Sequence, residues 1–165
     1  MFDGIFHNTA FLTLTGLLLV AVGFDLRFRI IPNWVCACIL VMGFVFQGVL
    51  FGVHGQIAAI TGVLMALAVF VPLYAMQWTG AGDAKLMAAV GAFLGPIGMV
   101  NAIVFTFIAG GMIALTHIVG RQSAVVAPRL LIFFAPNPDG KVFFPFAVAI
   151  AAGSVCAQFF TIVNL

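Results

Sequence analysis

Four aspartates are the only acidic side chains in this chain of 165 residues. Asp3 is in the N-terminal tail, and Asp139 lies in Asn-Pro-Asp-Gly, a turn sequence in which aspartate commonly bonds its own backbone. Asp25 and Asp83 instead border long apolar stretches. Because a carboxylate in apolar surroundings is unfavourable unless it has a partner or a task, these two are the candidates for chemistry.

Two carboxyl groups a few ångströms apart can divide the roles of acid and base, because both cannot ionise together and one keeps a proton. The ionised partner takes a proton from a water that attacks a peptide carbonyl, while the protonated one donates to the carbonyl oxygen. Gly80 and Gly82 precede Asp83 and let a substrate strand approach closely, since they lack a Cβ atom. Such a run of small residues also suits tight helix packing.

The composition indicates that lipid is the solvent for most of the chain. Hydrophobic residues make up 65% of it and charged residues 6%, which is more apolar surface than one soluble core of this size can bury. We therefore expect residues 1–165 to form a single membrane-embedded domain in the lipid bilayer. The net charge of +2 is small and scattered, so nucleic acid is not an expected partner.

Apolar stretches predict an all-α bundle of about six transmembrane helices, each close to the roughly 20 residues that cross a bilayer. The predicted helices cover residues 5–24, 33–51, 56–78, 80–95, 99–119 and 143–163. The fourth and fifth are separated at Gly95-Pro96, where proline interrupts the apolar run.

All the basic residues fall on one side of this arrangement, namely Arg27, Arg29, Lys85, Arg121, Arg129 and Lys141. The positive-inside rule makes that side cytoplasmic and puts both termini outside. Asp25 and Asp83 then lie at the cytoplasmic ends of their helices, where they can face each other. A purely structural alternative is that Asp25 pairs with Arg27 or Arg29, and Asp83 with Lys85, at the membrane surface.

Two motifs resemble those of the type IV prepilin peptidases. Asp25-Leu-Arg-Phe-Arg-Ile-Ile-Pro32-Asn33 is similar to their aspartate with Ile-Pro-Asn, and Gly80-Ala-Gly82-Asp83-Ala-Lys85-Leu is similar to their Gly-x-Gly-Asp signature. Pro145-Phe146 resembles the Pro-aromatic start of their last helix, although Ala147 stands where glycine is common.

The resemblance implies an aspartic endopeptidase that cuts the leader from prepilins or pseudopilins at the cytoplasmic face of the bacterial inner membrane. It implies Asp25 and Asp83 as the catalytic pair, and the supporting residues that come with the motifs are Gly80, Gly82, Lys85, Pro32 and Asn33. For Lys85, anchoring of its helix at the interface is favoured over stabilisation of a neighbouring carboxylate. Pro32 is expected to set the start of the second helix.

Larger members of that family carry paired Cys-x-x-Cys motifs, associated with methylation of the new N-terminus. Here the cysteines are Cys36, Cys38 and Cys156, without that motif, and we expect them to be buried packing residues. The chain therefore resembles the short, peptidase-only form associated with tight-adherence (Flp-type) pili, without methyltransferase activity. No cofactor is implied, and no metal site is expected, since no histidine has a ligand-spaced partner.

Two other classes of function stay open. One is a small proton- or cation-coupled transporter or channel subunit that uses Asp25 and Asp83, although such proteins favour charges near the midplane and internal repeats. The other is a non-catalytic assembly subunit.

The sequence leaves open the substrate, the oligomeric state, and whether the aspartate pair is preformed. It also leaves open the role of residues 120–141, where the apolar run 130–134 suits an interfacial helix, a re-entrant segment or a lid.

Overall fold

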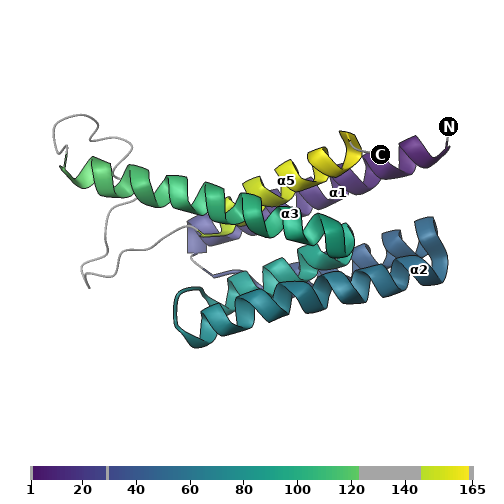
Figure 1. The fold of residues 1–165 in the computed structure, drawn as a ribbon, viewed down its shortest axis with the longest axis horizontal. Helices are drawn as coiled ribbons and strands as arrows, with labels where there is room; N and C mark the ends of the chain where they lie inside the picture. The colour runs from purple at the N-terminus through teal and green to yellow at the C-terminus, as the bar shows by residue number, and fades with distance from the viewer. Residues whose placement is uncertain (1, 29, 123–145, 164–165) are drawn as a thin grey trace.

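The structure is a computed structural model that describes residues 2–28, 30–122 and 146–163. These residues form the helices α1 (Phe2–Phe28), α2 (Asn33–Ala75), α3 (Ala81–Gln122) and α5 (Phe146–Val163), shown in Figure 1. The run at 130–134 lies outside the described residues.

Three apolar segments of the described chain are long enough to cross a membrane: Thr9–Phe28, Asn33–Ala75 and Ala81–Leu115. The apolar part of α5, Phe146–Phe159, is shorter. The prediction of an all-α membrane protein is confirmed, whereas six crossings stay a prediction.

The long helix α2 turns back on itself at Gly52, whose backbone is not helical (φ 58°, ψ −132°). The side-chain nitrogen of Gln56 donates a hydrogen bond to the carbonyl oxygen of Phe44 at 3.1 Å. In a straight helix these residues would be about 18 Å apart along the axis, so the chain must reverse between them. A positive φ favours glycine, which has no Cβ to clash with the backbone.

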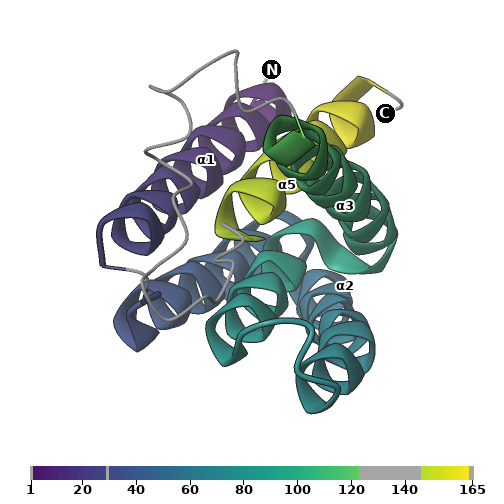
Figure 2. The same cartoon turned by 90° about the vertical axis from the view of Figure 1, so that its left-hand side faces the viewer.

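A second reversal divides α3 at Gly95, which also has a positive φ of 65°. Pro96 follows directly, and proline suits the first turn of a helix because its fixed φ matches and no N–H is needed there. Figures 1 and 2 show both long helices folding back: the two halves of α2 lie side by side, whereas the halves of α3 diverge from the turn between them. The predicted connections 52–55 and 95–98 are therefore too long, since one glycine is enough for each reversal.

The first predicted helix is too short at its C-terminal end. It was expected to end at residue 24, but α1 continues to Phe28 and includes Asp25. Hydropathy falls at Asp25 and Arg27, yet neither residue breaks a helix. Pro32 is the first strong obstacle, because proline disfavours helical backbone in the residue before it.

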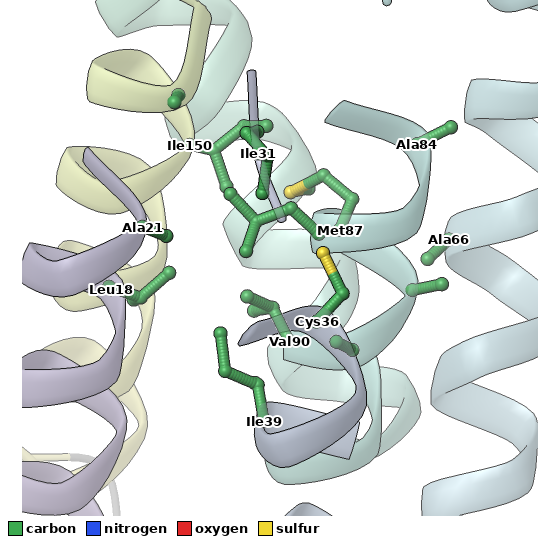
Figure 3. Close-up of a cluster of buried hydrophobic side chains, with 14 of the residues drawn as sticks. Leu18, Ala21, Ile31, Cys36, Ile39, Ala66, Ala84, Met87, Val90 and Ile150 are labelled. Atoms are coloured by element: carbon green, nitrogen blue, oxygen red, sulfur yellow. The ribbon is translucent and has the colours of Figure 1, made fainter. Parts of the chain in front are cut away.

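The core lies where α2 and α3 pack together and where α5 covers α3. Glycines allow this close approach: a Cβ on Gly62 would collide with the carbonyl oxygen of Gly91, and one on Gly43 would lie 2.9 Å from the backbone of Ala92. Figure 3 shows part of the apolar cluster, in which Ile31 and Cys36 gather with Met87 of α3.

The helix termini are divided between the two ends of the bundle. The start of α1 and the end of α5 lie at one end, and the α1–α2 and α2–α3 connections lie at the other (Figure 1). This arrangement brings the end of α1 and the starts of α2 and α3 into one neighbourhood, which contains both aspartate motifs.

Candidate active site

Asp83 is held by the backbone at the start of its own helix. Its Oδ2 accepts a hydrogen bond of 3.1 Å from the N–H of Gly80, while the carbonyl oxygen of Gly80 accepts bonds from the N–H groups of Asp83 (3.1 Å) and Ala84 (3.3 Å). The bond from the Gly80 N–H to the Asp83 side chain is one half of a capping box, and an acidic side chain is favoured in the first turn by the helix dipole. The motif thus begins α3 and orients the carboxylate at the same time.

The glycines of the motif lie close to other parts of the site. A Cβ on Gly80 would lie 3.2 Å from Oδ2 of Asp83. A Cβ on Gly82 would lie 3.4 Å from the Cβ of Ile31, which belongs to the first motif. The two motifs are therefore packed against each other, although they are far apart in the sequence.

Lys85 and Asn33 add a polar link between the motifs. The Lys85 Nζ donates a hydrogen bond to Asn33 Oδ1 at 3.0 Å, across 52 residues of sequence. Pro32 is the N-cap residue of α2, as expected for a residue that sets the start of this helix. The alternative in which Lys85 pairs with Asp83 is not what the structure shows, because the Lys85 side chain bonds to Asn33.

Asp25 lies inside α1, near its C-terminal end, with only 6% of its surface exposed. This is an unfavourable place for an acidic residue, since the helix dipole favours cations there and burial removes water from the carboxylate. Arg27 is exposed, and its guanidinium carbon lies 5.6 Å from the centroid of the Phe28 ring. Arg29 is outside the described residues.

The two candidate carboxyl groups lie within electrostatic range of each other. The thiol of Cys36, one turn along α2 from Asn33, lies within range of both Asp83 and Lys85. The structure therefore brings both aspartates, Lys85 and Asn33 together at one end of the bundle. Such a grouping is compatible with acid–base chemistry by the two carboxyl groups.

A model of the type IV leader peptidase family matches residues 12–115, which include both aspartates and both motifs. The chain belongs to this family. It is thus an aspartic prepilin peptidase by class, and the resemblance seen in the motifs is confirmed at the level of the family. Neither a curated protein nor a solved structure matches the chain.

Sequence reasoning missed the end of α2 in this family member. Gln77 has a positive φ of 60°, and its N–H bonds to the carbonyl oxygen of Tyr74 while that of Trp78 bonds to Leu73, each at 2.9 Å. These are the bonds of a Schellman motif, which usually has glycine where Gln77 stands. Without glycine or asparagine at this position, no residue type in the sequence indicates that α2 ends at Ala75 and not near residue 78.

The expectation for the cysteines is right for one of three. Cys36 is buried, but Cys38 and Cys156 are exposed. Residues two apart on a helix point to different sides, so Cys36 and Cys38 cannot both face the core. Cys36 lies beside the candidate site, which its apolar sequence context did not indicate.

Proposed function

We propose that this peptidase removes the leader peptide from Flp-like type IV prepilins, or from pseudopilins, at the cytoplasmic face of the inner membrane. Asp25 and Asp83 are the proposed catalytic pair. The observation that carries the proposal is the meeting of the two aspartate motifs at one end of the bundle, through the contacts of Gly82 with Ile31 and of Lys85 with Asn33.

The chemistry follows from two carboxyl groups that share one proton. The ionised group takes a proton from a water molecule, whose oxygen attacks the carbonyl carbon of the scissile peptide bond. The protonated group donates its proton to the carbonyl oxygen and stabilises the tetrahedral intermediate. When the intermediate collapses, the carbon–nitrogen bond breaks, the leaving amine takes a proton from one carboxyl group, and the other carboxylate takes the proton of a hydroxyl group of the intermediate, which restores the shared proton.

We further propose that the new N-terminus stays unmethylated. The sequence contains no Cys-x-x-Cys motif of the kind associated with the methylating members of the family. Mass spectrometry of the processed pilin tests this directly, with the mass of a free amino terminus expected and a gain of one methyl group contradicting it.

Co-expression with a candidate Flp-type prepilin tests the proposed cleavage. The wild-type chain should shorten the prepilin on a gel, whereas Asp25→Asn and Asp83→Asn should each abolish this shift while the protein still inserts into the membrane. Asp139→Asn is the matched control and should process normally, because Asp139 belongs to a turn sequence and to neither motif. Continued processing by either Asp25→Asn or Asp83→Asn would contradict the catalytic pair. If the wild-type chain leaves every prepilin intact, the peptidase proposal fails and a transport function gains support.

A further inference from the structure

The hydrogen bond between Lys85 and Asn33 joins the two aspartate motifs directly. Asn33 is the first residue of α2 and follows the segment that leaves α1 after Asp25. Lys85 lies in the second turn of α3, just beyond Asp83. The 3.0 Å bond from Nζ to Oδ1 thus connects the parts of the chain that carry the two carboxyl groups.

Neither side chain is placed to stabilise the helix to which it belongs. Asparagine is among the best N-cap residues, but the N-cap of α2 is Pro32 and no side chain caps this helix. Lys85 is near the N-terminal end of α3, whereas the helix dipole favours cations at the C-terminal end. The hydrogen bond of Lys85 with Asn33 therefore links α2 with α3 and does not stabilise either helix by itself.

Lys85 is also not the ion-pair partner of Asp83. Residues two positions apart on a helix do not face each other. The ammonium group bonds to Asn33, and Oδ2 of Asp83 accepts its bond from the Gly80 backbone. Lys85 thus leaves Asp83 available and binds the neighbouring helix.

The surroundings of the bond show that the starts of α2 and α3 are in contact. Gly82 lies against Ile31, two residues before Asn33. Cys36, which shares a helix face with Asn33, lies within electrostatic range of Asp83 and Lys85. Any movement of Asn33 away from Lys85 would therefore change the packing directly beside Asp83.

We propose that Lys85 and Asn33 are a positioning pair, which fixes the start of α2 to the start of α3 and so sets the separation of Asp25 and Asp83. The inference rests on the proposed function, in which these aspartates share a proton. The short segment between Asp25 and Asn33 transmits the restraint to the end of α1. A misplacement of about 1 Å in a catalytic site can lower the rate about 100-fold.

Kinetics of leader cleavage test the pair. Asn33→Ala and Lys85→Met should each lower kcat about 10- to 100-fold with KM nearly unchanged, since positioning affects the reacting groups more than substrate binding. The double variant should be no slower than either single variant, because both remove the same bond. The exchange Asn33→Lys with Lys85→Asn keeps a donor and an acceptor and should recover part of the rate.

Stability separates positioning from a structural role. Both side chains are exposed, and exposed polar pairs contribute little to the free energy of unfolding. Insertion and unfolding of both single variants should therefore match those of the wild type. An interfacial anchor predicts a different pattern, in which Asn33→Ala keeps the full rate, and that result would overturn the inference.

A cross-link measures the packing of the motifs without any cleavage. The Cβ positions of residues 31 and 82 are 3.4 Å apart, near the roughly 3.8 Å of a disulfide. In a chain with its native cysteines replaced by alanine, Ile31→Cys with Gly82→Cys should form a disulfide readily under mild oxidation by copper phenanthroline. Adding Lys85→Met should slow its formation several-fold, and an equal rate in both backgrounds would contradict the positioning pair. The rate of disulfide formation tests the positioning pair even if no prepilin is cleaved. Absence of prepilin cleavage would count against the proposed function alone.

Discussion

The side chain of Asp83 has two tasks in this proposal, since it caps α3 and takes part in catalysis. The cap needs only an acceptor for the Gly80 N–H group, which asparagine also provides. Proton exchange needs the carboxyl group. Asp83→Asn therefore separates the two tasks, and loss of cleavage in a stable Asp83→Asn protein would be chemical in origin.

The carboxylate orientation depends on the absence of a side chain at Gly80. In Gly80→Ala, the new Cβ would lie 3.2 Å from Asp83 Oδ2, so the carboxylate must move by a few tenths of an ångström. We expect cleavage to slow about tenfold, because catalytic groups tolerate little misplacement. Gly16→Ala is the control, since nothing lies within 4 Å of the added Cβ, and it should cleave normally. Equal rates for both variants would show that Gly80 does not orient Asp83.

The motifs could be predicted at the residue scale, but their contacts could not. Asp25 and Asp83 stand out because acidic residues are rare and costly in apolar sequence. The bond of Lys85 with Asn33 spans 52 residues and depends on the reversal at Gly52 and on the connection from α2 to α3, which both lie between them. Hydropathy and spacing carry no information on such a contact, and they favour an interfacial anchor at Lys85.

The backbone is strained at Gln77, just after the end of α2. Gln77 has a left-handed backbone with φ 60°, which costs a non-glycine residue about 1 to 2 kcal/mol. Gln77→Gly should therefore raise the free energy of unfolding by about 1 kcal/mol, and Gln77→Val should lower it, because a β-branched residue fits this conformation poorly. Unfolding in mixed micelles measures both. Destabilisation by glycine would contradict the strained conformation.

Close packing of α2 on α3 depends on facing glycines. In Gly62→Ala, the methyl group would collide with the backbone carbonyl of Gly91, which cannot rotate away as a side chain can. We expect a loss of about 1 to 3 kcal/mol, as for other overpacked interiors. Gly111→Ala, with nothing within 4 Å of the added Cβ, should be neutral or slightly stabilising in the same unfolding measurement. If Gly62→Ala behaves like this control, the two helices are not in backbone contact.

The helices and the positions of the turns between their halves were largely predictable, whereas the length of these turns was not. Long apolar runs marked α1, α2, α3 and α5, since spanning helices must be apolar. The end of the second predicted helix at residue 51 and the break at Gly95-Pro96 mark both reversals in the sequence, but each reversal uses one glycine where a longer connection is predicted. Contacts such as that of Gln56 with Phe44 show how tightly the chain reverses, which hydropathy does not indicate.

For the whole molecule, six crossings with both termini outside stay a prediction, and exposed residues near the two reversals and in the α2–α3 connection allow a test of it. Val53 and Ile97 lie next to the reversals and are 75% and 77% exposed, and Trp78, in the α2–α3 connection, is 71% exposed. Single cysteines at residues 53 and 97 in a cysteine-free chain should react with a membrane-impermeant maleimide added outside intact spheroplasts. A cysteine at residue 78 should react only after permeabilisation. The opposite pattern would invert the topology and move the site to the outer face.

Whether Asp25 and Asp83 act as one catalytic pair is decided by the rate at which the purified chain, reconstituted in lipid, cleaves a prepilin. General acid–base groups each contribute about 10² to 10⁴-fold to a rate, and groups that act as a unit are strongly non-additive. Asp25→Asn and Asp83→Asn should therefore each lose at least about 100-fold, and the double variant should be no slower than the slower single variant. A single variant that keeps a rate close to that of the wild type, or losses that multiply in the double variant, would contradict a shared-proton pair.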